Sequence, residues 1–299
     1  MKGFLIGHAD DQVAKTGCTV LLCPEGAIAG VDVRGGAPGT RETALLDPRM
    51  TVECVHGVLL SGGSAFGLDA ASGVMQYLEE QGIGFDTGVA KVPIVPAAVL
   101  FDLAVGQAAI RPTAKMGYHA CVNAEDGIPL RGNIGAGTGA TVGKEKGMHL
   151  AMKSGFGFSI FERDDFFVAA GIAVNSFGEI FSETGERIAG VQISENQTPD
   201  QKPFLGSNTT IGFILTNAIV TKSQANKLAS VGHNGYARSI RPCHTPYDGD
   251  TLFCLSTAKI PFDFYSLCKV TEQVVASAVI DAVEQAESIP GFPAARGKG

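Results

Sequence analysis

Two aspartates, one residue apart, are the first candidates for chemistry in this sequence. Asp248 and Asp250 lie within residues 244–251, which have the composition of a turn followed directly by a strand. Residues two apart in a strand point to the same face, so the two carboxylates could project together. Aspartate-rich turns are common, and this pair indicates a site only if a partner lies nearby.

Asn175 offers a neutral amide at the end of an apolar run. It follows residues 168–174 and precedes a serine and a glycine-containing turn. An amide in this place could donate hydrogen bonds to an oxyanion that develops during a reaction, or it could simply begin a turn. The residues alone leave both interpretations open.

Lys144 closes a glycine-rich stretch, residues 135–144, and could supply a fixed positive charge. Clustered backbone N–H groups can cradle phosphate. A P-loop, however, needs glycine five residues before its Gly-Lys pair and serine or threonine after it, where this chain has Thr138 and Glu145. We therefore expect no nucleotide cofactor.

A second glycine-rich stretch carries two serines, Ser61 and Ser64. It resembles the Gly-x-Ser-x-Gly turn of hydrolases, but its second glycine comes one residue late. We expect one of these serines to cap the helix predicted for residues 65–77, by accepting a free backbone N–H.

The elements that must position these residues are short strands and a few amphipathic helices. Helical spacing and a capping box formed by Thr221 and Gln224 predict further helices at residues 221–238 and 270–283. Irregular interleaving of strands and helices indicates a layered mixed α/β or α+β domain. Strands buried on both faces are predicted at residues 18–22, 55–60, 166–174, 211–215 and 251–255.

The sharpest change in composition lies between residues 183–208, which are polar, and Thr209, which opens a hydrophobic strand. A loop meets a core element at this point. The more common use of such a segment is an ordinary surface loop between two strands.

The overall composition excludes some classes of binding partner and indicates the cellular compartment. With 299 residues, 45% of them apolar, the chain can bury a large core. A net charge of −7 gives no attraction to nucleic acid or to anionic lipid. The longest apolar run, residues 92–101, is about half a membrane span, and the start of the chain lacks a signal-peptide core. Seven cysteines without a Cys-x-x-Cys pair and six scattered histidines predict a cytoplasmic protein without a metal.

Six segments together resemble the DmpA-type peptidase family, the L-aminopeptidase/D-esterase group that includes β-aminopeptidases and 6-aminohexanoate-oligomer hydrolases. They occur in the expected order and span nearly the whole chain, so the set is far more specific than any one of its members. The segments are residues 34–42, 61–69, 135–144, 175–178, 208–212 together with 216–218, and 244–251.

The resemblance implies an α+β fold, a four-layer αββα sandwich of the self-processing N-terminal-nucleophile type. It also implies one catalytic domain, residues 1–299, that cuts itself between Asn208 and Thr209 into chains of residues 1–208 and 209–299. Several members of the family are tetramers of such pairs, so we expect a homo-oligomer.

By motif position, Thr209 is similar to the family's nucleophile and Asn175 to its oxyanion donor. Asp248 and Asp250 are similar to the paired residues that position the nucleophile, and Lys144 resembles the family's active-site lysine.

Two departures from the family pattern bear on substrate choice. Aminopeptidase members often carry Ser-x-Glu where this chain has Asp248-Gly-Asp250, the version associated with the aminohexanoate-oligomer hydrolases. A tyrosine that helps to form the oxyanion site in some members corresponds to Phe101.

The chemistry implied by the resemblance needs no cofactor. A free N-terminal threonine carries its own base, because an α-amine has a pKa of roughly 7.7 to 8.0. The expected substrate is a small amide or short peptide: an N-terminal L- or D-amino acid, a β-amino acid or an ω-amino acid oligomer. The alternatives are acyl transfer of the ornithine acetyltransferase type and a non-catalytic binding scaffold.

Overall fold

The computed structural model describes residues 1–192 and 208–296. In this part of the chain the largest sheet runs in the order β10-β11-β14-β16-β2-β4-β7-β3, and β1 pairs with β2 outside that path. Short strands form the ladders β13-β12-β15, β5-β6 and β8-β9. The strands are β1 (Leu5–Asp11), β2 (Thr16–Val33), β3 (Thr40–Arg41), β4 (Cys54–Ser61), β5 (Phe85–Asp86), β6 (Lys91–Val92), β7 (Ala97–Val99), β8 (Thr141–Val142), β9 (Met152–Lys153), β10 (Phe156–Arg163), β11 (Phe166–Asn175), β12 (Glu179–Phe181), β13 (Arg187–Ala189), β14 (Thr209–Ala218), β15 (Ile240–Arg241) and β16 (Thr251–Ile260); the helices are α1 (Ala70–Glu80), α2 (Ala114–Val122), α3 (Lys222–Ser239) and α4 (Phe264–Glu284).

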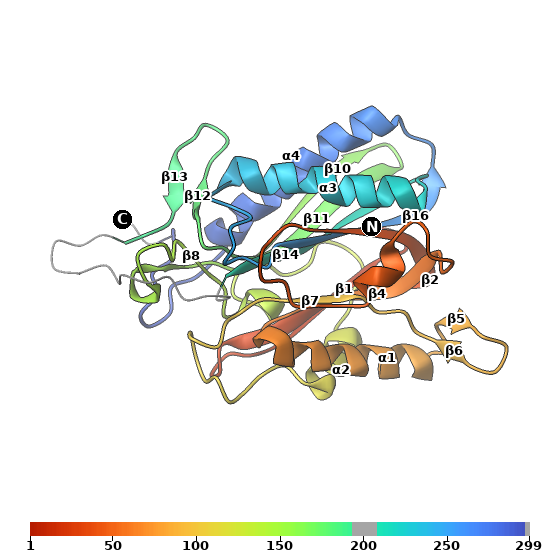
Figure 1. The fold of residues 1–299 in the computed structure, drawn as a ribbon, viewed down its shortest axis with the longest axis horizontal. Helices are drawn as coiled ribbons and strands as arrows, with labels where there is room; N and C mark the ends of the chain where they lie inside the picture. The colour runs from red at the N-terminus through yellow and green to blue at the C-terminus, as the bar shows by residue number, and fades with distance from the viewer. Residues whose placement is uncertain (193–207, 297–299) are drawn as a thin grey trace.

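The long strand β2 divides this sheet into two halves. Its first part pairs with β1 and β4, its last part pairs with β16, and the register with β4 shifts between Leu22 and Ala27. Helices α3 and α4 cover the half that contains β11 and β14, whereas α1 and α2 cover the half that contains β4 (Figure 1). The layers are therefore helix, sheet, sheet, helix, as predicted, but β2 makes the two sheets continuous.

Strand β14 shows how the layers are filled. Ile211, Phe213 and Leu215 face the core between the two halves of the sheet, whereas Ile214 and Ala218 face the core under α3 and α4. Successive side chains of a strand point to opposite faces, so a strand between two cores must be apolar on both. The prediction of strands buried on both faces is confirmed.

The start of the first predicted helix was wrong. A 3-10 helix, Ser64–Asp69, precedes α1, and neither of these helices has a side-chain cap bond in the described chain. The Ser61 hydroxyl donates to the Gly62 carbonyl instead. Gly63 and Ser64 have φ angles of +80° and +53°, so the backbone turns here through a left-handed conformation that delays the α-helix.

The other two predicted helices are present. The capping box at the start of α3 is formed as predicted, since Thr221 and Gln224 each accept the other's backbone N–H. Helix α4 begins earlier than its apolar stripe, because Asp263 caps it by accepting from Ser266 N. Helix α2 and strand β10 were not predicted from the sequence pattern. No helix in residues 1–192 and 208–296 is both long and apolar enough to cross a bilayer.

Replacing Thr221 with alanine should lower the thermal midpoint, because one end of the capping box is lost at a cost of about 1 kcal/mol. Thr113→Ala is a matched control, since Thr113 is also an exposed, extended N-cap residue but makes no cap bond in the described structure. Equal midpoints for the two variants, measured by differential scanning fluorimetry, would contradict the role assigned to the box.

Candidate active site

Two of the predicted site residues face each other across neighbouring strands. Asn175, the last residue of β11, is paired in register with Thr209, the first residue of β14. Opposite residues of an antiparallel pair project to the same face. By strand periodicity that face is the inner one, which Ala173 and Ile211 share. Both residues are buried.

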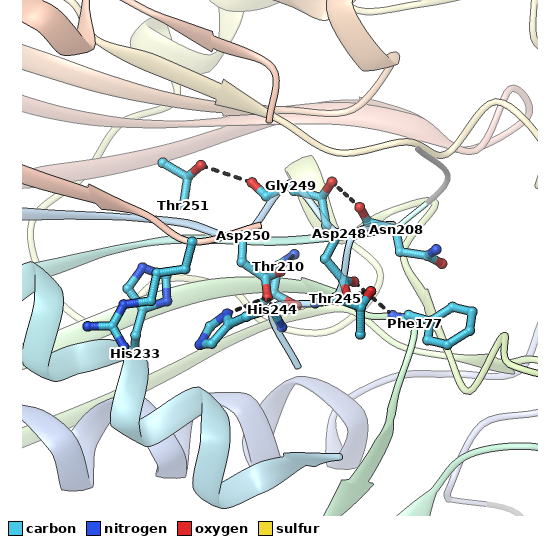
Figure 2. Close-up of polar contacts among 12 residues, drawn as sticks. Phe177, Asn208, Thr210, His233, His244, Thr245, Asp248, Gly249, Asp250 and Thr251 are labelled. Carbon is cyan, nitrogen blue, oxygen red and sulfur yellow. Dashed lines mark hydrogen bonds and ion pairs between the residues drawn. The ribbon is translucent and has the colours of Figure 1, made fainter. Parts of the chain in front are cut away.

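The peptide bond before Thr209 is held by two donors. The Thr209 hydroxyl donates to the Asn208 carbonyl oxygen, and the Gly249 N–H donates to the same oxygen at 3.1 Å. Asn208 also forms a parallel bridge with Asp248 (Figure 2). Donors aimed at a carbonyl oxygen stabilise the negative charge that it gains when the carbon is attacked.

Gly249 is a site residue that the sequence reasoning missed. A Cβ at this position would lie 2.8 Å from Thr209 Oγ1 and 2.7 Å from the Ala37 carbonyl, so only glycine allows this close approach. The available signal was the glycine between the two aspartates.

Asp250 holds the backbone on the other side of the nucleophile. Its Oδ1 accepts the Thr210 N–H at 2.8 Å, and its Oδ2 accepts the backbone N–H of His244 and lies 2.8 Å from Nδ1 of the same residue. The side chain is buried, so these donors replace the water that the carboxylate has lost.

The Asp248 carboxylate binds the connection between β11 and β12 and the start of its own loop. Its Oδ1 accepts the Phe177 N–H at 3.1 Å and its Oδ2 accepts both the N–H and the hydroxyl of Thr245. Burial and the neighbouring charge of Asp250 raise the pKa of Asp248. Figure 2 shows both carboxylates running to the same side of the loop backbone, as the two-residue spacing predicts.

The loop thus holds the chain on both sides of Thr209. Asp248 bridges to Asn208 through its backbone, and the Asp250 carboxylate accepts the Thr210 N–H. The Asp248 carboxylate binds Phe177 and Thr245 instead, and the hydroxyl of Thr209 bonds to Asn208. Direct positioning of the Thr209 side chain by these acids stays a prediction.

The segment after β2 supports this loop from behind. Arg34 and Gly35 donate their backbone N–H groups to the Asp250 carbonyl, and Ala37 donates to the Asp248 carbonyl. A Cβ on Gly35 would lie 2.3 Å from the Asp248 oxygen and 2.4 Å from the Asp250 nitrogen. The motif of residues 34–42 indicates the family, and the structure adds that its first residues support the loop of Asp248 and Asp250.

Lys144 lies against Asn175. Its Nζ donates to Asn175 Oδ1 at 2.6 Å and to the Asn175 carbonyl at 3.0 Å. Burial lowers the pKa of Lys144 to about 7, although the charges of Asp248 and Asp102 act in the opposite direction. A lysine with such a pKa can change its protonation state near neutral pH, which is typical of functional sites.

The loop that carries Lys144 is anchored by a second buried lysine. Lys153 donates to the carbonyls of Gly137 and Ala140 at 3.0 Å each and to that of Ser154. Three carbonyl acceptors match its three N–H bonds. The carbonyls of the glycine-rich stretch therefore hold a buried lysine, and the structure gives this stretch a packing task.

The Asn175 amide is oriented by its neighbours. Its Oδ1 accepts from Thr141 N at 3.0 Å as well as from Lys144, and its Nδ2 donates to the Phe101 carbonyl at 2.9 Å. That bond uses one of the two N–H bonds of the amide. Phe101 therefore lies at the site, as its motif position predicts, and contacts Asn175 through its backbone carbonyl.

The comparison with protein families identifies the chain. The model of peptidase family S58 matches residues 1–296. The chain belongs to peptidase family S58. It is therefore a hydrolase that acts on amide bonds.

Several proteins are similar to this S58 chain in sequence. An uncharacterized aminopeptidase of Mycobacterium leprae is 40% identical over 93% of this chain and 84% of its own length. A 6-aminohexanoate-oligomer endohydrolase of an Agromyces species is 31% identical over 86% of this chain and 74% of its own length.

Two solved structures share the fold. A β-aminopeptidase of a Burkholderia species aligns with a TM-score of 0.73 at 17% identity, over 96% of this chain and 85% of its own. The L-aminopeptidase D-Ala-esterase/amidase of Ochrobactrum anthropi, a variant of the Ntn hydrolase fold, gives 0.73 at 18% identity, over 98% and 87%. The predicted resemblance and fold class are confirmed.

Replacing Gly35 with alanine should lower the kcat for an aminoacyl p-nitroanilide by about 100-fold, because the added methyl displaces the loop that holds Asp248 and Asp250. Gly88→Ala is the control. It places alanine at φ +81° with nothing within 4 Å, so it adds backbone strain without a clash. A Gly35→Ala enzyme with normal kcat would show that the contact does not align the loop.

Proposed function

We propose that this S58 hydrolase cuts itself between Asn208 and Thr209, and that Thr209 then serves as its N-terminal nucleophile. The observation that supports this most is that the Asn208 carbonyl oxygen accepts two hydrogen bonds, one from the Thr209 hydroxyl and one from the Gly249 N–H. The whole of residues 1–299 acts as one catalytic unit, cut into chains of residues 1–208 and 209–299.

Self-cleavage proceeds in two steps. The Thr209 oxygen attacks the Asn208 carbonyl carbon, the C–N bond breaks, and the hydroxyl proton passes to the leaving nitrogen. The resulting ester is hydrolysed by water, which leaves a carboxylate on Asn208 and both a hydroxyl and an α-amine on Thr209. The Gly249 N–H stabilises the oxyanion of the first step.

In the mature enzyme the new α-amine is the general base. With a pKa of roughly 7.7 to 8.0 it takes the hydroxyl proton as Thr209 attacks a substrate amide, and later gives a proton to the leaving amine. Asn175 donates to the oxyanion through its amide, a type of contact worth about 3 to 4 kcal/mol in other hydrolases.

The charged groups around Thr209 complete the site. Lys144 lies on Asn175, where a positive charge favours the anionic intermediate. Asp248 and Asp250 position the nucleophile through the backbone on both sides of it and attract the α-ammonium form of its amine.

The substrate we propose is a small amide or short peptide with a free amino end. The names of the relatives include both aminopeptidases and a 6-aminohexanoate-oligomer endohydrolase. The Asp-Gly-Asp version of the loop is the one associated with the latter group, so ω-amino acid oligomers are the preferred class. We place the enzyme in the cytoplasm as a homo-oligomer of processed pairs.

The wild-type protein should yield a fragment that begins Thr-Thr-Ile-Gly, and Thr209→Ala should remain one uncut chain without activity. Intact-mass analysis measures both. Thr210→Ala is a matched control, because Thr210 is an equally buried neighbour whose hydroxyl finds no partner among the described residues, and it should still be cut. Normal cutting of the Thr209→Ala protein would assign the nucleophile elsewhere.

The processed enzyme should hydrolyse 6-aminohexanoate oligomers with a higher kcat/KM than α-aminoacyl p-nitroanilides. A parallel assay with an N-acetylated amino acid and an acceptor amine measures acyl transfer to an amine in place of water. Transfer that outpaces hydrolysis of both amides would move the enzyme to the acyltransferase class.

A further inference from the structure

His244 has a left-handed backbone conformation, which is uncommon for any residue other than glycine. Its φ angle is +55°, in a region that asparagine, aspartate and histidine enter more often than other side chains. This conformation brings its backbone N–H and its ring Nδ1 to one oxygen, Asp250 Oδ2, at 3.0 Å and 2.8 Å. Strained residues persist only where the surroundings hold them in place, and they cluster at functional sites.

Helix α3 packs against the imidazole ring of His244. The ring of His233 meets it edge-on with centroids 4.8 Å apart, and the ring of Tyr236 lies at 6.2 Å (Figure 2 shows the two histidines). Both helix residues are fully buried. His233 Nε2 lies 3.0 Å from the Asp32 carbonyl, and burial lowers the pKa of this histidine to about 4, so it packs as a neutral ring.

The environment favours the charged form of His244. Burial of the ring acts against protonation, but hydrogen bonds and charges from Asp250 and Cys243 outweigh it and raise the pKa of His244 to about 10. Asp250 and His244 therefore form an ion pair with a charge-assisted hydrogen bond, which is shorter and stronger than a neutral one.

The ion pair leads directly to the nucleophile. Asp250 Oδ2 is bound by His244, while Oδ1 of the same carboxylate accepts the Thr210 N–H at 2.8 Å. That N–H belongs to the peptide that joins Thr209 to Thr210. The carboxylate thus connects the ring of His244 to the peptide that follows Thr209.

We propose that His244 is a positioning residue, which locks the Asp250 carboxylate in the orientation that fixes the peptide after Thr209. This inference rests on the proposed role of Thr209. It assigns to His244 a contribution to self-cleavage and to turnover that acts through Asp250, without contact with the substrate.

The test compares His244→Ala and His244→Asn with the wild type. Alanine removes the ring donor, which should slow self-cleavage of freshly synthesised chain and lower the kcat of the processed enzyme by about 10- to 100-fold, with KM within twofold. Asparagine should restore both rates to within about threefold, because its amide nitrogen can donate where Nδ1 did and asparagine tolerates a positive φ.

His233→Ala is the matched control for lost packing. It removes a ring that is more buried than that of His244 and touches it, but that donates nothing to Asp250. We expect a lower thermal midpoint together with self-cleavage and kcat within twofold of the wild type. If self-cleavage and kcat fall in both alanine variants in proportion to the drop in thermal midpoint, the contribution of His244 is packing alone.

The remaining outcomes separate the two proposals. A His244→Ala enzyme with wild-type rates, or a His244→Asn enzyme as slow as His244→Ala, overturns the role of His244 and leaves the nucleophile untouched. A wild-type protein that stays one polypeptide overturns the self-cleavage proposal, and the role of His244 falls with it.

Discussion

The structure of the site depends on three consecutive residues that hold the backbone around Thr209. Asp248, Gly249 and Asp250 contact the residue before the threonine and the residue after it. A buried carboxylate must recover the hydrogen bonds that it loses to water, and these acids recover them from backbone N–H groups. The loop can be buried only when β14 is in place, so its folding and the alignment of Thr209 are linked.

Close backbone approach makes this arrangement possible. Gly249 lets the loop touch Thr209, and Gly35 lets the segment after β2 touch the loop. A side chain at either position would overlap backbone atoms, which cannot move aside as a flexible side chain can. The high glycine content of the chain is therefore in part a requirement for layers of backbone that lie against each other without side chains between them.

Burial also sets the charges of the site. It lowers the pKa of Lys144 to about 7 and raises that of Asp248, which brings the two groups toward the pH at which enzymes work. His244 shows the opposite balance, because its direct bond to Asp250 outweighs the cost of burial. The same buried surroundings thus shift the pKa values of adjacent groups in different directions, depending on the hydrogen bonds that each one makes.

The sequence by itself determined which residues are candidates and where five of the buried strands lie, namely parts of β2, β4, β11, β14 and β16. Residue type carries that information: Thr209 opens an apolar strand, Thr221 and Gln224 form a capping box from local spacing, and ordered motifs give the family. Only the tertiary structure decided that Asn175 lies opposite Thr209, since a shift of one residue in the pairing would turn either side chain to the other face.

Tertiary structure alone also supplied the Gly249 N–H and the contact of His244 with Asp250. A backbone donor has no residue type to mark it, and a left-handed histidine is set by the loop around it. The continuous sheet has the same origin, because β2 joins the two halves by pairing with β4 and with β16, which lie far from each other in the chain. Helix caps and the buried faces of strands follow from the spacing of nearby residues and can be predicted from it. How those faces pack against each other depends on contacts between residues far apart in the chain.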